Sequence, residues 1–339
     1  MMTKKVLLKD IAKKAGVSTA LVSYVLNGLE KEKRVGRDVV EKINKIAKEL
    51  NYQPNQIARS LRSGKTKTIG LIIADISNPF SGQIARFIEG EAARLGYTVI
   101  IGSTDENSTK FSSLIDSMLY RQVDGLIMAP AEGSSQKIKK LVKEQVPFVF
   151  IDRYFPGISA NHVVLDNYEA TYNAVNYLIA HGRKNICLII YKTLAVHMQQ
   201  RILGYKHAMK DNGLEDNIIV KEIPRRSYFQ VKADTEKNMD ELFADKKMDA
   251  LLFAANALSI SGLYAIRKHK IKVPDELAVI GFDGHEVFDF FEPPIAYIKQ
   301  PLEEMGTEAV RILVEQIKGV KKTVHTEVKH QFISRESGG

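Results

Sequence analysis

From Thr68 onward the sequence alternates short apolar runs with amphipathic helical segments. The runs are almost continuously hydrophobic, which is typical of strands buried on both faces of a parallel sheet. They cover Ile69–Ile73, Thr98–Gly102, Gly125–Ala129, Phe148–Ile151, Val163–Leu165, Ile186–Ile190, Ala250–Phe253 and Ala278–Gly281. Strands that alternate with helices build sheets covered by helices on both faces, so this part of the chain is predicted to be α/β. Ligands of such sheets bind beyond the carboxyl ends of the strands.

Length and hydropathy limit the class of protein. With 339 residues, of which 45% are hydrophobic, the chain is long enough for two or three domains with their own cores. No apolar run approaches the roughly 20 residues of a membrane helix, and the cluster Val6–Leu8 is too short for the core of a signal peptide. We therefore expect a cytoplasmic protein without a membrane partner. The single cysteine, Cys187, lies in an apolar run and is interpreted as a buried hydrophobic residue.

The positive charge of the chain is concentrated at its amino-terminal end. Residues 1–67 contain 16 Lys or Arg and 6 Asp or Glu, whereas the remainder contains 33 basic and 34 acidic residues. The whole excess behind the net charge of +9 therefore lies in the first fifth of the chain. A basic segment attached to a neutral body is typical of a nucleic-acid-binding module, although a run of charge is more often only a solvated face.

Two short helices joined by a tight turn are predicted within this basic segment. Residues Leu8–Ala15 carry apolar side chains at helical spacing, and Thr19–Leu26 do the same. Gly16 can end the first helix in the left-handed conformation, and Ser18 can cap the second by accepting from a free backbone amide. Such a pair forms a helix-turn-helix, whose second helix enters the major groove of DNA. A third amphipathic helix over Arg37–Leu50 would close a small core.

The basic segment resembles the lac and galactose repressor family. The residues that carry the resemblance are Lys9 to Ser18, Val22-Ser23, Val25-Leu26-Asn27, Leu50-Asn51-Tyr52-Gln53-Pro54-Asn55 and Ala58-Arg59-Ser60-Leu61. The resemblance covers nearly the whole chain. It implies an all-α helix-turn-helix head over residues 1–53 and a hinge helix with linker over residues 54–65. It also implies an α/β body of two Rossmann-like, parallel-sheet lobes, as in periplasmic sugar-binding proteins.

The resemblance also implies which head residues contact DNA. Thr19, Ala20 and Tyr24 take the groove-facing positions of the recognition helix. The full set expected from the head is Ser18, Thr19, Ala20, Ser23, Tyr24 and Asn27. Family members usually carry Thr where this chain has Leu21 and Arg where it has Tyr24, and an arginine there would pair with guanine O6 and N7. The usual operator sequence of the family is therefore in doubt, and Tyr24 has the alternative role of packing against the third helix.

The segment from Pro54 to Arg62 resembles the hinge helix of the family. A helix of about two turns is marginal alone in water, so we expect it to form only when paired with its dimer mate on DNA. In the family a Leu at the position of Leu61 wedges into the minor groove and kinks the central base step. The DNA contacts expected from this segment are Asn55, Ala58, Leu61 and Arg62. A plain linker is the alternative.

The chain is expected to cross between the two lobes of the body more than once. One lobe would hold residues 66–163 together with 294–322, and the other residues 164–293 together with 323–336. Polar residues follow several of the expected strands, where the resemblance implies the ligand contacts of sugar-binding proteins. These are Asn78, Phe80, Asp152, Arg153, Arg201, Phe229, Asn256, Asp283 and Gln300. Phe229 is chosen as the aromatic residue of the second lobe, with Tyr228 as its competitor.

The chemistry of this set suits a sugar. Carboxylates and arginines supply fixed acceptors and forked donors for neighbouring hydroxyls, and Phe80 can cover the apolar face of a ring. Taken singly, the residues have plainer roles: Asp283 can cap a helix, Asp152 and Arg153 can pair with each other, and Asn256 can form a turn. Ala257 stands where the family often has Asp, so the sugar is not specified. No basic cluster with a phosphate-cradling glycine loop occurs in the body, which argues against a phosphorylated effector.

Enzyme motifs are missing from the sequence. It has no Gly-x-Ser-x-Gly elbow, dinucleotide fingerprint, phosphate loop or His-Glu-x-x-His, and its histidines show no metal spacing. A hydrolase that uses Asp152 and Asp283 is conceivable. Arg153 and Arg201 beside them are expected to hold both carboxylates ionised, which suits binding better than acid catalysis. We therefore expect neither catalysis nor a cofactor.

These features together predict a sequence-specific DNA-binding transcriptional regulator, a repressor by preference, whose operator affinity is controlled by a small sugar or sugar derivative in the interlobe cleft. Its expected partners are near-palindromic double-stranded operator DNA, the sugar and a second copy of the chain, and its expected location is the nucleoid. The last strand is followed by no leucine heptads, which favours dimers over tetramers. The alternatives are a sugar-binding receptor without a DNA function and a regulator with a purine-type co-repressor.

Overall fold

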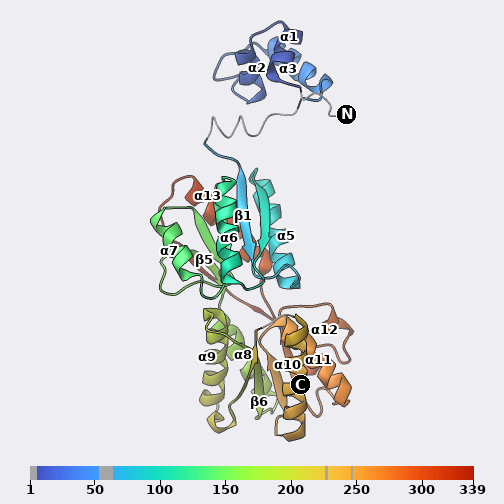
Figure 1. The fold of residues 1–339 in the computed structure, drawn as a ribbon. Helices are drawn as coiled ribbons and strands as arrows, with labels where there is room; N and C mark the ends of the chain where they lie inside the picture. Colours follow the sequence, from blue (N-terminus) through green and yellow to red (C-terminus); the bar gives the residue numbers. More distant parts are fainter. Residues whose placement is uncertain (1–5, 53–63, 226–227, 246) are drawn as a thin grey trace. The chain divides into compact units, whose positions relative to one another are not determined.

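The computed structural model describes residues 6–52, 64–225, 228–245 and 247–339, with the side chains of Tyr228, Phe229 and Asp245 excepted (Figure 1). The chain divides into two compact units, Met1–Thr66 and Lys67–Gly339. The first unit contains the helical head. The second contains two α/β lobes, as the alternation of strands and helices predicts.

The head consists of α1 (Leu8–Ala15), α2 (Thr19–Leu26) and α3 (Arg37–Glu49) around one small core. Ile11, Val22 and Ile43, one from each helix, are fully buried in it. Gly16 ends α1 in the left-handed conformation, with φ of 69°, and Ser18 Oγ accepts from the amide of Leu21 at 3.2 Å as the cap of α2. The predicted helix-turn-helix is therefore confirmed in its helices, its turn and both of its caps.

The first lobe is built on a six-stranded parallel sheet in the order β11-β5-β4-β3-β1-β2. Its strands are β1 (Thr68–Ile73), β2 (Thr98–Ser103), β3 (Gly125–Met128), β4 (Phe148–Ile151), β5 (Asn161–Leu165) and β11 (His325–Val328). Helices α5 (Pro79–Arg94) and α13 (Leu302–Ile317) pack on one face, and α6 (Ser108–Tyr120) and α7 (Ser135–Lys143) on the other. Alternate residues of β1 point to opposite faces of the sheet. Leu71 belongs to the core on the side of α5 and α13, and Ile72 to the core on the side of α6 and α7.

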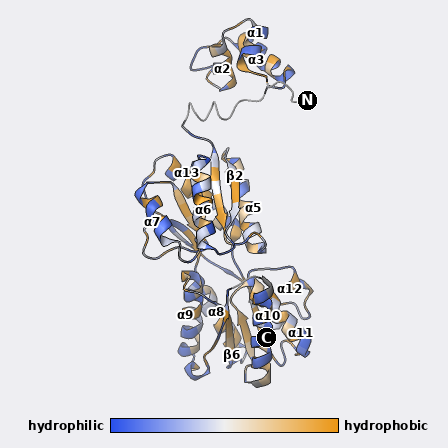
Figure 2. Cartoon of the chain, viewed as in Figure 1, coloured by the Kyte–Doolittle hydropathy of each residue, from blue (hydrophilic) through white to orange (hydrophobic). Residues whose placement is uncertain are grey.

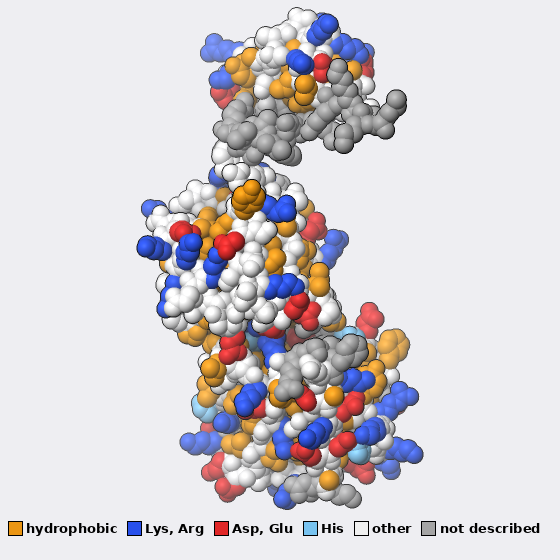
Figure 3. All heavy atoms as spheres, in the orientation of Figure 1, with side chains coloured by type: hydrophobic (Ala, Val, Ile, Leu, Met, Phe, Trp, Pro, Cys, Tyr) orange, Lys and Arg blue, Asp and Glu red, His pale blue; other side chains and the backbone are white. Residues whose placement is uncertain are grey.

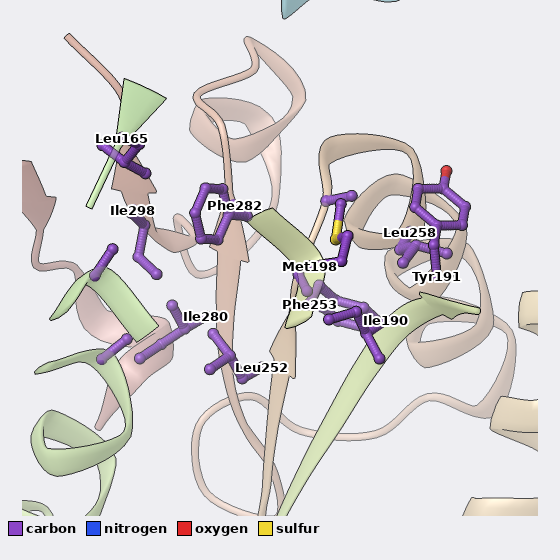
Figure 4. Packing of buried hydrophobic residues seen from close by; sticks show 14 of the residues in the cluster. Leu165, Ile190, Tyr191, Met198, Leu252, Phe253, Leu258, Ile280, Phe282 and Ile298 are labelled. Atoms are coloured by element: carbon purple, nitrogen blue, oxygen red, sulfur yellow. The ribbon is translucent and has the colours of Figure 1, made fainter. Parts of the chain in front are cut away.

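The second lobe repeats this plan with the strand order β12-β10-β9-β8-β6-β7. The strands are β6 (Ile186–Lys192), β7 (Ile219–Pro224), β8 (Ala250–Phe253), β9 (Ala278–Phe282), β10 (Ala296–Lys299) and β12 (Gln331–Ile333), and only the pairing of β12 with β10 is antiparallel. The helices are α8 (Asn167–Ala180), α9 (Val196–Asp211), α10 (Tyr228–Asp245), α11 (Asn256–His269) and the short α12 (Val287–Phe290). Figure 4 shows Leu252, Ile280 and Ile298 meeting from three neighbouring strands.

Three crossings join the lobes, from β5 to α8, from β10 to α13 and from β11 to β12. Two of the predicted lobe assignments are therefore wrong: β10 belongs to the second sheet, and β11 to the first. The segment 323–336, which was expected to lie wholly in the second lobe, contains two strands, one in each lobe. Hydrophobic periodicity indicates that a segment is extended, whereas the sheet it joins depends on tertiary pairing at the edges, which the pattern does not encode.

Close packing fixes the helices that border the interlobe region. Gly204 of α9 lies so near α8 that a Cβ added there would be 2.3 Å from the carbonyl oxygen of Tyr168. Figure 2 shows that the strands are mostly hydrophobic, in orange, and that the helices carry hydrophilic residues, in blue, on their outer faces.

Cys187 is fully buried in β6, as predicted, and burial raises the pKa of its thiol to about 12. Within the described residues, no helix has both the length and the apolar character needed to span a membrane.

Candidate effector site and DNA-binding head

A cavity of about 710 Å³ lies at the carboxyl ends of the strands and is lined by residues of both lobes. This volume is within the range of roughly 300–1,000 Å³ that is typical of small-molecule sites. Eight of the nine predicted effector residues line it: Asn78, Phe80, Asp152, Arg153, Arg201, Asn256, Asp283 and Gln300. The ninth, Phe229, begins α10 next to Tyr228, and its side chain lies outside the described part of the chain.

Asp152 and Asp283 occupy equivalent positions in the two lobes. Each follows the third strand from the edge of its sheet that carries the crossings, β4 in the first lobe and β9 in the second. Both have left-handed backbones, with φ of 69° and 62°. The amide of Asp152 donates to Val163 O at 3.1 Å, and that of Asp283 donates to Ile298 O at 2.9 Å. The ladder thus holds each backbone in place while the carboxylate faces the cavity.

The carboxyl group of Asp283 is held by a neighbouring amide. Gln300 Nε2 donates to Asp283 Oδ1 at 2.7 Å, and Gln300 itself is buried. Burial raises the pKa of Asp283 to about 6, although Arg201 and the hydrogen bond from Gln300 both act to lower it. The helix-cap role considered for Asp283 is not observed, because Glu286 occupies the cap position of α12.

Arg201 is fixed from three sides. Its Nε donates to Asn167 Oδ1 at 2.8 Å and its Nη1 to Ala254 O at 2.5 Å. Its guanidinium carbon lies 3.5 Å from the centroid of the Phe282 ring. Burial lowers its pKa to about 10, opposed by Asp283 and Asp152, so the group remains charged at neutral pH. The remaining N–H groups of a guanidinium held in this way are oriented donors.

Arg153 has a stronger partner than the one considered from the sequence. Its Nη1 and Nη2 donate to the two carboxylate oxygens of Glu106 at 2.9 and 2.7 Å, whereas its Nε lies 3.4 Å from Asp152 Oδ2. Glu106 also pairs with Arg225 of the second lobe at 2.5 Å. Burial tends to raise the pKa of Glu106, but the two arginines outweigh it and lower that pKa.

The arginines do not lower the pKa values of the two aspartates as expected, although a pKa of about 6 leaves Asp283 mostly ionised at neutral pH. Burial raises the pKa of Asp152 and of Asp283, and it outweighs the opposing effect of Arg153 and Arg201. Distances to charged neighbours are only one of the influences on a buried carboxyl group, and desolvation disfavours its charged form. The sequence shows the neighbours of these aspartates but not the depth at which they are buried.

Three buried polar atoms that line the cavity have no hydrogen-bond partner among the described residues: Arg153 Nε, His197 Nδ1 and Asn256 Nδ2. The three residues are at most 4% exposed. A buried polar group without a partner costs about 1–3 kcal/mol, and most such groups in folded proteins are paired. Three of them around one cavity indicate a site for a polar ligand. Burial and the nearby arginines lower the pKa of His197 well below its ordinary value, so its ring is neutral.

The residues that line the cavity and that sequence reasoning missed include Glu106, Tyr191, His197 and Arg225. Arg225 directly follows β7, a strand that was not predicted because Lys221 and Glu222 interrupt its apolar run. Recognition of that strand would have marked Arg225 by the same strand-end argument that identified the others. In the part of the chain that the structure describes, no group of three or more His, Cys, Asp or Glu is arranged to hold a metal ion.

The head presents its predicted DNA-contacting residues on α2. Thr19 and Ala20 are exposed, and Tyr24 is half-buried with Lys33 Nζ 5.9 Å from its ring centroid. Ser18 Oγ is used as a helix cap, and Asn27 Nδ2 donates to Ser23 O at 2.6 Å. Figure 3 shows Lys and Arg side chains over the visible surface of the head. The predicted contacts Asn55, Ala58, Leu61 and Arg62 lie outside the described residues.

The first helix of the head has an unusual start. Leu7 stands where the lac and galactose repressor family has a threonine as the helix cap. Its side chain makes no hydrogen bond to the helix end. Instead Asp10 Oδ2 accepts from the amide of Leu7 at 2.8 Å. A carboxylate in the first turn satisfies a free amide and interacts favourably with the helix dipole, so α1 retains a defined start.

Comparison with known proteins agrees with both units. Residues 7–55 match the bacterial regulatory proteins of the lacI family, and residues 175–338 match a periplasmic binding protein-like domain. The HTH-type transcriptional regulator DegA of Bacillus subtilis (strain 168) is 31% identical over 326 residues, which cover 94% of this chain and 93% of DegA. Catabolite control protein A of Priestia megaterium is 32% identical over 346 residues, which cover 98% and 99% of the two chains.

The fold also matches a solved structure over its full length. The crystal structure of the lac repressor dimer bound to operator and the anti-inducer ONPF has a TM-score of 0.87 at 22% identity, with 99% of both chains covered. The sequence identity and coverage of DegA and of catabolite control protein A decide the family assignment. The chain belongs to the lacI family of bacterial regulatory proteins, DNA-binding transcriptional regulators that respond to small-molecule effectors.

Proposed function

We propose that this protein is a homodimeric repressor whose effector is an uncharged sugar or sugar derivative bound in the interlobe cavity. The observation that carries the proposal is the set of three buried polar atoms without a hydrogen bond, on Arg153, His197 and Asn256, around a cavity that both lobes line. Neutral hydroxyls can act as donors and as acceptors, so a polyol is able to pair all three.

The remaining lining residues favour the same class of ligand. Asp152 and Asp283 provide acceptors from opposite lobes, Arg201 provides oriented donors, and Phe80 provides an apolar surface at the start of α5. Asn78 caps α5 through its side-chain oxygen, which accepts from Phe80 N at 3.0 Å, and so holds that ring at the cavity. A site that pairs specific hydroxyls rejects analogues that lack them, because its own polar groups then stay unpaired.

The DNA function is assigned to the head. Two copies of α2, carried by the two subunits of a dimer, would lie in successive major grooves of a near-palindromic operator about one helical turn apart. Lys and Arg of the basic head would neutralise phosphates, so log K is expected to fall with log salt by about 0.9 per phosphate contacted. The site of action is the nucleoid in the cytoplasm.

The effector acts on DNA binding through the angle between the lobes. The three crossings allow one lobe to rotate on the other, and a ligand held by Asp152 and Asp283 prefers the angle at which both contacts form. A ligand shifts such an equilibrium only by its difference in affinity for the two states. Coupling energies of about 1 to 3 kcal/mol, or roughly 5- to 150-fold in affinity, are typical.

A thermal-shift screen of the full-length protein tests the ligand class. The panel holds free monosaccharides and disaccharides, their phosphates, and purine bases and nucleosides. We expect a neutral sugar to raise the melting temperature in the wild type and not in Asp283→Ala, since a specific ligand stabilises the native state by mass action. Stabilisation by a purine instead of any sugar would contradict the proposal. Prolonged incubation with the stabilising sugar is expected to leave it unchanged, and turnover would show that the two carboxyl groups catalyse.

A further inference from the structure

Glu106 lies between two arginines that belong to different lobes. It follows β2 of the first lobe, and both of its carboxylate oxygens accept from Arg153, at 2.7 and 2.9 Å. The same carboxylate pairs at 2.5 Å with Arg225, which follows β7 of the second lobe. The side chains of Glu106 and Arg153 are 20% and 5% exposed, so the pair is shielded from bulk solvent. All three residues line the effector cavity.

Glu106 and Arg225 follow the strands at the sheet edges opposite the crossings. β2 and β7 are the last strands in their sheets, whereas β5, β11, β10 and β12, which carry the crossings, are at the other edges. The bond from Glu106 to Arg225 therefore joins the lobes where rotation about the crossings would separate them most. A second contact joins the lobes nearby, where Thr193 Oγ1 donates to Glu132 Oε2 at 2.6 Å. No arginine takes part in this hydrogen bond.

The backbone at Glu106 is held in an unfavourable conformation. Asp105 and Glu106 are consecutive non-glycine residues in the left-handed region, with φ of 51° and 61°. Such residues persist where the surrounding structure over-determines them, and they cluster at functional sites. Here Asp105 Oδ1 accepts from Ser103 Oγ at 2.8 Å, and the amide of Glu106 donates to Ala74 O at 3.3 Å. The loop thus presents the Glu106 carboxylate to the arginines.

The arrangement has the chemistry of an anion site that is already filled. A forked, two-point contact from one guanidinium with a second guanidinium alongside is how proteins bind carboxylate and phosphate ligands. In this chain the anion is supplied by Glu106 itself. An anionic effector would have to displace Glu106, leave its carboxylate near Asp152 and break the contact between the lobes.

We propose that Glu106 determines the charge specificity of the effector site: as a built-in counter-ion of Arg153 and Arg225 it excludes ligands that carry phosphate or carboxylate groups. The inference rests on the proposed function, since it names the class of effector that the same cavity rejects. It also assigns Glu106 as the residue whose loss would open the cavity to anions. Neutral sugars leave the cluster intact and bind beside it.

The test uses inorganic phosphate as the probe, with full-length Glu106→Gln and the matched variant Glu132→Gln, which alters the other carboxylate that joins the lobes. Melting temperature is followed against phosphate concentration at constant ionic strength. Phosphate is expected to stabilise Glu106→Gln with an apparent affinity about tenfold or more above that of the wild type, because Arg153 and Arg225 then lack the carboxylate that they share. The wild type and Glu132→Gln are expected to show equal, weak responses.

A charge-balanced variant covers the case in which Glu106→Gln does not fold. The double variant Glu106→Gln with Arg225→Gln removes one charge of each sign and leaves Arg153 facing the cavity. Its affinity for phosphate is expected to lie between those of the wild type and Glu106→Gln. Equal phosphate responses of the wild type and of every folded Glu106 variant would overturn the proposal. The readout needs no sugar, so it stands apart from a failure of the sugar screen, which would contradict only the proposed function.

Discussion

The side-chain amide of Gln300 donates to the carboxylate of Asp283 at 2.7 Å, and Gln300 is the residue at which the chain leaves β10 and crosses to α13 in the first lobe. A group that contacts the effector cavity is therefore hydrogen-bonded to a crossing between the lobes. Any change in the charge or position of Asp283 acts on that crossing directly. Under the proposed function, this contact would couple the effector to the angle between the lobes.

The first prediction concerns the pH dependence of effector affinity. The pKa of Asp283 is about 6 in the unliganded protein, and a sugar hydroxyl that donates to this group favours its charged form. Sugar affinity is therefore expected to be constant above about pH 7 and to fall by up to about tenfold per unit below pH 6. Calorimetric titrations from pH 5 to 8 measure this dependence. Asp283→Asn should bind weakly without the dependence, and an equally steep profile in this variant would assign it to another group.

The second prediction concerns stability. Because the folded pKa of Asp283 is raised from 3.8 to about 6, the folded state binds more protons than the unfolded state between these values. The contribution of Asp283 to the free energy of unfolding therefore falls as pH rises from about 4 to 6, and Asp283→Asn removes this loss. The variant is expected to be more stable than the wild type at pH 7.5 by about 3 kcal/mol. Urea denaturation at pH 4.5 and 7.5 measures it, and an advantage of the same size at both pH values would refute the explanation.

The third prediction concerns base readout by Tyr24. Tyr24 is half-buried on α2, where the family usually has an arginine that can pair with guanine. Tyr24→Arg is expected to change the preferred base at one position in each half-site, with a discrimination of about 1–3 kcal/mol. Selection from a random duplex pool with both proteins shows the change. Identical enriched sequences would indicate that Tyr24 does not face the bases.

The fourth prediction concerns Leu61, which lies outside the described residues and whose role follows from the family resemblance. Leu61→Ala removes the wedge expected to enter the minor groove, so operator affinity should fall while sugar affinity stays unchanged. Anisotropy with a labelled operator measures the first quantity and calorimetry the second. Unchanged operator affinity would leave the segment as a plain linker.

The fifth prediction uses two glycines of the body. A methyl group on Gly204 would meet the carbonyl oxygen of Tyr168 at 2.3 Å, whereas one on Gly90 of α5 meets nothing within 4 Å. Gly204→Ala must separate α8 from α9 and is expected to cost about 1–3 kcal/mol. Gly90→Ala should stabilise by about 0.5–1 kcal/mol through helix propensity. Equal melting temperatures for the two variants would show that the helices adjust freely.

The head and several polar residues of the effector cavity could be predicted from the sequence because their signals are local. Gly16 and Ser18 mark a turn by their own chemistry, and Asp152 and Asp283 directly follow recognisable strands. The sheet to which β10 or β11 belongs depends on pairing with distant strands. Glu106 meets Arg225 only because β2 and β7 are edge strands of two different sheets. The raised pKa values of the two aspartates depend on burial, which neighbours in sequence do not reveal.

The most direct measurement of the central claim is the affinity of the full-length protein for a selected operator duplex, by fluorescence anisotropy at fixed salt, with and without the sugar that stabilises the protein. We predict that saturating sugar changes the operator dissociation constant by roughly 5- to 150-fold in the wild type and leaves it unchanged in Asp283→Ala. An identical dissociation constant with and without sugar, when calorimetry shows that the sugar is bound, would contradict an effector role for the cavity.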